Sequence, residues 1–194
     1  MRILGAILHL AIAGTAAYWI EWSSAKNQGR KTRALCAALP CLFTFLIYLR
    51  RPYVADAVQG LAFVLILFTA ALQDVYRRKV DDSLSVMLVL TALISFQQDD
   101  IPLKLAGAVA CSLPLLIAGM SPKEGMGGAD IKLMAALGFF LGLHKGLAAL
   151  FIGLGSGVVC VCICRKAKKR PINTPFPLVP YLAAGGCLAY ILPI

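Results

Sequence analysis

The chain has 194 residues, of which 60% are hydrophobic and only 14% charged, and its formal net charge is +10. Soluble globular domains carry about a quarter charged residues, so this composition excludes an ordinary soluble protein and predicts an all-α, polytopic integral membrane protein. At about 20 apolar residues for each span, the length predicts about eight transmembrane helices in a single domain, 1–194, with no separate soluble domain.

The basic residues occur in short clusters between apolar runs. This pattern is typical of membrane topology and of contact with anionic lipid headgroups, and it argues against a nucleic-acid footprint. The seven cysteines form no C-x-x-C pair, so neither a zinc site nor a disulfide framework is predicted. We therefore expect a lipid bilayer as the surroundings, no nucleic-acid partner, no metal and no cofactor; the sequence does not indicate the oligomeric state.

Two apolar spans are expected near the N-terminus, at 3–20 and at about 34–49, on either side of the basic loop 21–33. A signal peptide is the alternative for the first run. That run ends in aromatic and charged residues instead of a small-residue cleavage site, so we expect it to remain as a membrane helix.

Further spans are expected at about 54–72, 83–96 and 102–119, the last with Pro114 inside it. The loop after 54–72 holds Asp74 and a group of basic residues. A later helix, from Asp130 to about Leu143, has about fourteen residues, or about 21 Å, which is too short for a hydrocarbon core of about 30 Å. Asp130 should therefore lie below the bilayer surface in a water-accessible recess. The last two spans are expected at about 146–164 and after the proline-rich stretch 171–180.

With eight spans, the odd-numbered loops carry fourteen lysines and arginines and the other side carries five. By the positive-inside rule the odd-numbered loops are cytoplasmic. Asp74, in the third loop, and Asp130, after the fifth span, are then predicted to lie on the same cytoplasmic face.

Asp130 follows Gly127 and Gly128 at the point where a glycine-rich turn opens into an apolar helix. The alternative interpretation is a helix N-cap, since aspartate is favoured there. An ionisable group at membrane depth is, however, a candidate functional residue by default. Two carboxylates that meet cannot both ionise cheaply, so one can hold a proton while the other activates water, as in aspartic proteases. The sequence does not say which of Asp74 and Asp130 is protonated.

For the other acidic residues we expect structural or interfacial roles. Asp81 and Asp82 precede a span and are predicted to be N-caps, and they are weak candidates for contacts with a basic substrate, together with Glu124. Asp56 stays unassigned, and His144 is expected to be interfacial at an outer turn.

Three segments resemble the type IV prepilin peptidase family. Residues 127–133, Gly-Gly-Ala-Asp-Ile-Lys-Leu, are similar to its G-x-G-D motif, and 74–80, an aspartate followed by a basic loop, to its other catalytic motif. Residues 174–185, rich in proline and aromatic side chains, resemble the start of its last helix. The resemblance implies a GxGD-type membrane aspartic protease with its core at about 54–194.

As the resemblance implies, such an enzyme cleaves the short basic leader from prepilins or prepseudopilins, whose N-terminal hydrophobic helix follows the leader. It would act at the cytoplasmic face of a bacterial or archaeal cell membrane. By position, Asp74 and Asp130 match the catalytic pair, Gly127 and Gly128 the turn that shapes the site, and Lys132 the lysine after the second aspartate.

The sequence departs from the family pattern in three places. Ala129 replaces a glycine, and Asp81 stands where proline is common. The first cytoplasmic loop, 21–33, lacks the cysteines of the domain that larger members use for N-methylation. This resembles the small, peptidase-only form, in which methyltransferase activity is not expected.

The alternative from another class is a small multipass transporter or channel subunit that uses Asp74 and Asp130 as ion or proton sites. The glycine and proline pattern shows no inverted repeat, which counts against it. A third interpretation is a non-catalytic scaffold of a pilus assembly machine, in which both aspartates would tolerate substitution.

Overall fold

The computed structural model describes residues 54–93, 101–120, 127–168 and 177–192, together with Pro40, Leu42, Phe43 and Phe45. The predicted span 3–20, the loop 21–33, most of the span 34–49 and Glu124 lie outside the described residues. The side chain of Asp56 is also not described, so that residue stays unassigned.

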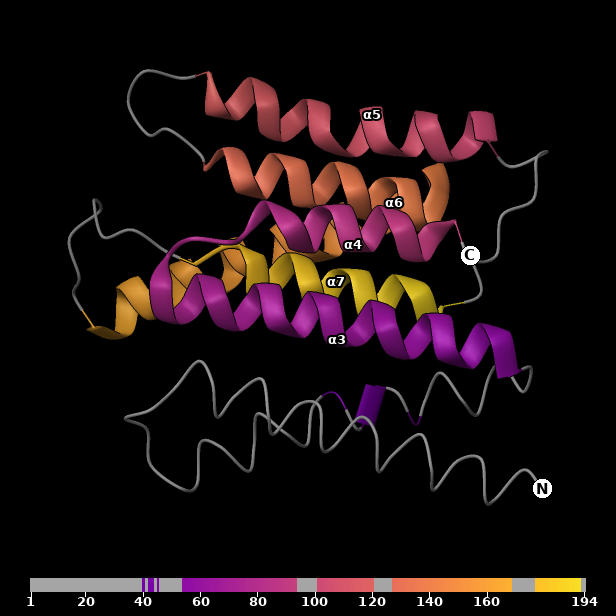
Figure 1. The fold of residues 1–194 in the computed structure, drawn as a ribbon. Coiled ribbons are helices and arrows are strands. Elements are labelled where there is room, and N and C mark those ends of the chain that lie inside the picture. The colour runs from indigo at the N-terminus through magenta and orange to yellow at the C-terminus, as the bar shows by residue number, and fades with distance from the viewer. Residues whose placement is uncertain are drawn as a thin grey trace.

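All regular structure in the described segments is helical, as the composition predicts. In chain order the helices are α3 (Val54–Arg77), α4 (Asp82–Ala92), α5 (Ile101–Gly119), α6 (Gly128–Lys168) and α7 (Val179–Ile191) (Figure 1). Within these segments, three stretches are long and apolar enough to cross a membrane: Val58–Arg77, Ile101–Gly119 and Gly128–Ile163. The chain is therefore an all-α membrane protein; the predicted total of about eight spans includes residues that the structure does not describe.

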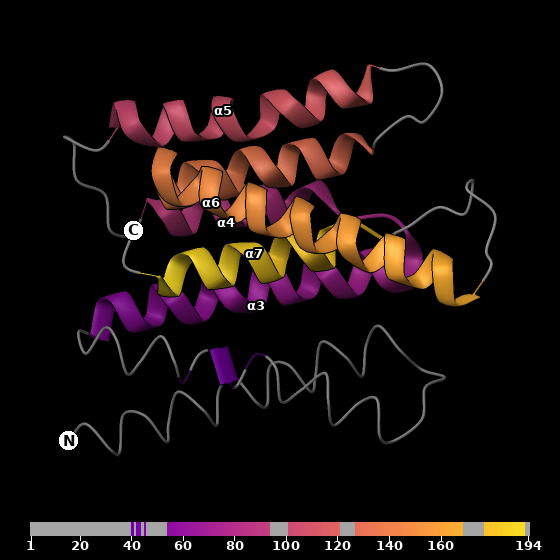
Figure 2. The same ribbon diagram turned by 180° about the vertical axis from the view of Figure 1, so that it is seen from behind.

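Helix α6 is two helices joined at Gly142, where the backbone adopts φ 76° and ψ −179°. Glycine suits this left-handed conformation because it has no Cβ. The second half of α6 runs back in the opposite direction from the first (Figure 2). The prediction of a short helix after Asp130 is thus confirmed, with the break one residue before Leu143. The apolar stretch of the second half ends at Ile163, as the predicted span to about residue 164 requires, and the helix itself continues to Lys168.

Glycine pairs let the helices around α6 approach closely. A Cβ added to Gly107 of α5 would lie 2.5 Å from the carbonyl oxygen of Gly138 in the first half of α6. A Cβ on Gly185 of α7 would clash with the carbonyl oxygen of Ala149 and lie 2.7 Å from the amide nitrogen of Gly153 in the second half. Small residues at such contacts are typical of membrane helix packing, where close backbone approach provides the attraction.

Three aromatic rings join α3, α6 and α7 in the core. The centroids of Phe63 and Phe140 are 4.3 Å apart, those of Phe63 and Tyr190 are 5.1 Å apart, and those of Phe140 and Tyr190 are 5.8 Å apart. Phe63 is fully buried and the other two rings are each 9% exposed. Phe63 stands eleven residues from Asp74, Phe140 ten residues from Asp130 and Tyr190 eleven residues from Val179, or about 15–17 Å in each helix at 1.5 Å per residue. The cluster therefore fixes how far these three helices extend toward the site.

We predict that Gly185→Ala destabilises the protein by at least about 2 kcal/mol, because its new methyl group would meet backbone atoms that cannot rotate away. Gly155→Ala is the matched control, since a Cβ there meets nothing within 4 Å. Alanine in a helix is favoured over glycine by about 0.5–1 kcal/mol, so this variant should be slightly stabilised. Thermal unfolding in detergent micelles would measure both; equal effects of the two substitutions would contradict the close packing of α6 on α7.

Candidate active site

Asp74 lies in the last turn of α3. Its backbone carbonyl accepts a hydrogen bond of 3.0 Å from the amide of Arg78, so the prediction that α3 ends near residue 72 was wrong. The helix continues because no glycine or proline interrupts residues 71–77. It ends at Arg78, which has φ 54° and is the one non-glycine residue of the described segments with a positive φ. A left-handed residue commonly ends a helix, but glycine is usual there.

The Asp74 carboxylate is anchored by α7. The backbone amide of Val179, the first residue of that helix, donates a buried hydrogen bond of 3.0 Å to Asp74 Oδ2. The side chain of Asp74 is only 9% exposed. The guanidinium of Arg78 also acts on it electrostatically. Burial disfavours a charge on the carboxylate, whereas a hydrogen bond to a charged group stabilises it by about 1.5–3 kcal/mol.

Asp130 lies in the first turn of α6, and its amide donates a hydrogen bond of 3.0 Å to the carbonyl of Gly127. Its side chain is half-buried and bends back over Gly127, where an added Cβ would be 3.5 Å from Asp130 Oδ2. Within the described segments, the carboxylate has no hydrogen bond or ion pair. The helix N-terminus favours its negative charge by only about 0.3–1 kcal/mol.

The two carboxylates come together although they are far apart in sequence. Asp130 is close enough to Asp74 for the negative charge of one to act on the other. They approach from the C-terminal end of α3 and the N-terminal end of α6, with the start of α7 beside Asp74. Like charges at such a site favour a state with one shared proton. This arrangement can supply a base and an acid to the same reaction.

The glycines before Asp130 contribute space, and neither has a left-handed backbone. A Cβ on Gly128 would meet nothing within 4 Å, and one on Gly127 would meet only the Asp130 carboxyl group at ordinary contact distances. The two glycines therefore leave the surface next to Asp130 uncovered. The methyl group of Ala129, where the family pattern has glycine, packs against the core.

Asp81 does not act as the predicted side-chain cap. It occupies the N-cap position of α4 without a capping hydrogen bond. Its carboxylate accepts a hydrogen bond of 2.8 Å from Gln73 Nε2, and its amide donates one of 3.0 Å to Gln73 Oε1. Sequence reasoning missed this pair, which closes the turn directly after Asp74.

Asp82 is the first residue of α4 and forms an ion pair with Lys132 of α6. The two side chains are 62% and 59% exposed, and such exposed pairs contribute about 0–1 kcal/mol. N-capping by Asp82 was therefore also a wrong prediction. The ion pair joins the start of α4 to the first turn of α6, two residues beyond Asp130.

An apolar groove of about 570 Å³ begins at this ion pair. It lies between α4, α5 and α6, and apart from the ion pair its lining is almost entirely apolar: Ser85, Val86, Val89, Ala108, Ala135, Ala136 and Phe139. An apolar chain in this groove would have one end beside the Asp82–Lys132 ion pair, two residues along α6 from Asp130.

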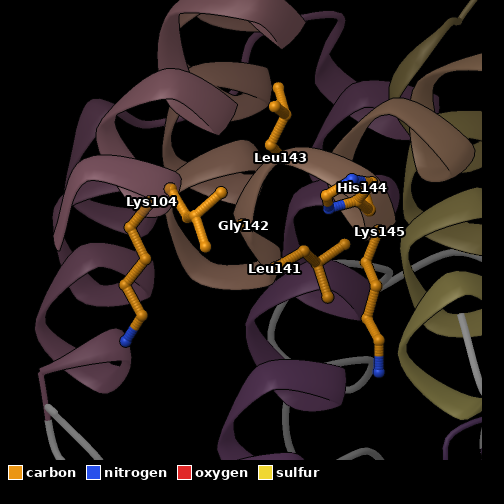
Figure 3. Close-up of a pocket in the computed structure, with 7 residues that line it drawn as sticks. Lys104, Leu141, Gly142, Leu143, His144 and Lys145 are labelled. Carbon is orange, nitrogen blue, oxygen red and sulfur yellow. The ribbon is translucent and has the colours of Figure 1, made fainter. Parts of the chain in front are cut away.

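A second pocket, of about 220 Å³, surrounds the break in α6 at Gly142. Lys104 of α5 and Lys145 of α6 extend toward the same side of it, with Leu141 between them (Figure 3). Gly142 is fourteen residues beyond Gly128, or about 21 Å along the helix, so this pocket is separate from the pair of aspartates. His144, expected at an outer turn, lines it and is exposed.

Four cysteines of the described segments, Cys111, Cys160, Cys162 and Cys187, are free thiols. No group of three His, Cys, Asp or Glu residues lies together in those segments. Cys111 and Cys187 are buried as free thiols, and the hydroxyl of Tyr181 lies 3.0 Å from Cys160 Sγ. These thiols pack between helices.

Comparison with known proteins identifies one family to which the chain is similar. The model of the type IV leader peptidase family matches residues 61–163, more than half of the chain. Relatives named prepilin leader peptidase/N-methyltransferase are 41% identical over 91 residues in Bacillus subtilis, 34% over 139 in Xanthomonas campestris and 32% over 143 in Neisseria gonorrhoeae. These alignments cover 45%, 66% and 68% of this chain but only 35%, 48% and 47% of the relatives. No solved structure gives a significant match.

We predict that Gln73→Ala speeds amide hydrogen exchange at Asp81 about fivefold, because a hydrogen bond of about 1 kcal/mol is lost. Hydrogen exchange read by mass spectrometry on a peptide spanning residues 78–84 would measure this. Gln59→Ala is the matched control on the same helix. It removes the bond from Gln59 Nε2 to the Thr91 carbonyl at the other end of α4, and it should leave exchange at Asp81 unchanged.

Proposed function

Because the chain belongs to the type IV leader peptidase family, we propose that it is a membrane aspartic endopeptidase that removes the leader peptide from type IV prepilins or related precursors. Asp74 and Asp130 are its catalytic pair. The proposal is supported most by the approach of these two carboxylates, one from α3 and one from α6, in the family-matched part of the chain.

The chemistry needs only the two aspartates and a water molecule between them. The ionised carboxylate takes a proton from the water, and the resulting hydroxide attacks the carbonyl carbon of the scissile peptide bond. The protonated carboxyl group gives its proton to the departing amine as the C–N bond breaks. One C–O bond has formed and one C–N bond has broken, and the pair again holds a single proton. That proton is now on the carboxyl group that began ionised, and its transfer to the other carboxylate restores the site for another cycle.

The surroundings of Asp130 suit an extended peptide. The uncovered surface at Gly128 leaves room for a substrate backbone beside the carboxyl group. Lys132 pairs with Asp82 at the mouth of the apolar groove, and this weak, exposed contact links the start of α4 to the first turn of α6. Gly127, Gly128 and Lys132 therefore shape the site in this proposal, whereas Asp74 and Asp130 perform the reaction.

The proposed setting is the cell membrane of a bacterium or archaeon, with one multipass domain and the site facing the cytoplasm. The excess of lysine and arginine in the odd-numbered loops supports this orientation. The substrate is a precursor with an N-terminal hydrophobic helix, which reaches the site from within the same bilayer.

We predict that Asp74→Asn and Asp130→Asn each lower the rate of leader cleavage at least about 100-fold, because each removes an acid–base group. The assay would reconstitute the full chain in detergent with a prepilin from Bacillus subtilis or Neisseria gonorrhoeae and follow the loss of the leader by mass spectrometry. Asp82→Asn, an equal change of charge at the site's edge, should retain more than a tenth of the activity.

Full cleavage by either of the first two variants would refute the catalytic pair. If the wild-type protein cleaves no precursor but carries an ion flux in proteoliposomes that depends on Asp130, a transporter would replace the protease.

A further inference from the structure

The environments of the two aspartates differ, and the difference assigns their roles. This inference rests on the proposed function. Asp74 receives the Val179 amide at 3.0 Å and the positive charge of Arg78, and the amide of Leu178 adds a weaker contact. Asp130 has no such donor among the described residues and faces the charge of Asp74. A carboxylate that accepts backbone N–H bonds is stabilised in its ionised form.

The start of α7 is built to supply this donor. The first amides of a helix have no carbonyl partner inside the helix, and Pro180 in the first turn has no amide to donate. The Val179 amide is therefore directed outward, and Asp74 Oδ2 is its acceptor. Since the bond is buried, water does not compete for it.

Arg78 makes the second contribution from the end of α3. Its left-handed backbone, φ 54°, turns the chain directly after the last helical residue. Glycine would adopt this conformation without strain. The backbone conformation therefore does not explain why this position holds an arginine. Arg77, one residue earlier, is exposed and has the same charge, but only Arg78 acts on Asp74.

We propose that the Val179 amide and Arg78 oppose the effect of burial on Asp74 and make it the first of the two carboxyl groups to ionise, so that Asp74 is the base that takes a proton from water and Asp130 is the acid that protonates the departing amine. Val179 and Arg78 are positioning groups, since they act through Asp74. Within the described segments, the charged groups that face Asp74 are Arg78 at the end of its own helix and Asp130 on α6; α7 presents only backbone amides.

The test is the dependence of kcat/KM on pH, whose acid limb reports ionisation of the base in the free enzyme. Val179→Pro removes the amide, so the ionised form of Asp74 loses its donor and the acid limb should move to higher pH by about one unit. On that limb cleavage is then about tenfold slower at a fixed pH. Val179→Ala keeps the amide and should keep the acid limb in its wild-type position.

The arginine variants test the same assignment without touching α7. Arg78→Gln should move the acid limb in the same direction by less, since the side chain is exposed and its charge is screened. Arg78→Gly should do the same while it relieves the left-handed backbone, so lost stability cannot explain its effect. Arg77→Gln removes the same charge one residue away and should leave the acid limb in place.

Proline at 179 disfavours the αR conformation of Leu178. If Val179→Pro folds, shown by a cooperative thermal transition, an unmoved acid limb overturns the assignment. If it does not fold, the Arg78 variants decide, and an unmoved acid limb in both overturns it. Either result leaves the protease itself intact, because its failure would appear separately, as full activity of Asp74→Asn or Asp130→Asn.

Discussion

The hydrogen bond from the Val179 amide to the Asp74 carboxylate closes the bundle at the candidate site. It joins residues 105 positions apart, and it forms only when the C-terminal end of α3 and the N-terminal end of α7 meet. A buried carboxylate without a donor would be expensive, and so would a buried helix N-terminus without an acceptor. The amide and the carboxylate satisfy each other's hydrogen-bonding need. The contact that joins α3 to α7 therefore also fixes the position of Asp74.

The position of Asp130 depends on packing at a distance. The rings of Phe63, Phe140 and Tyr190 hold α3, α6 and α7 together, and the glycine contacts of Gly107 with Gly138 bring α5 onto the first half of α6. The break at Gly142 ends this half. The polar ties from Gln73 to Asp81 and from Lys132 to Asp82 are exposed and individually weak. Apolar packing therefore determines the arrangement of the helices. The two polar contacts stabilise only the turn after α3 and the starts of α4 and α6.

Residue types and their order were enough to predict the all-helical class and the short helix after Asp130. They also singled out Asp74 and Asp130, which lie close enough for their charges to interact. These features have direct sequence signs: apolar runs, carboxylates at their edges, and a glycine-rich turn. The Val179 amide could not be found in this way, because every residue except proline carries a backbone donor. The sequence signal for the start of α7 was Pro180, since proline is common in the first turn of a helix. The roles of Asp81 and Asp82 were misjudged because a capping pattern does not show that Gln73 and Lys132 compete for the carboxylates. The extension of α3 was missed because the residue that follows its last turn is Arg78, where glycine is usual.

The spacing between Phe140 and Asp130 has a consequence for variation in this segment. A helix turns by about 100° for each residue, and Phe140 is held by its two aromatic neighbours. One residue inserted or deleted between them would rotate the carboxyl group by that angle and displace it along the axis, away from Asp74, with every side chain still chemically suitable. The length of this stretch is thus constrained as firmly as the identity of the aspartate, and relatives should tolerate substitutions here more readily than gaps.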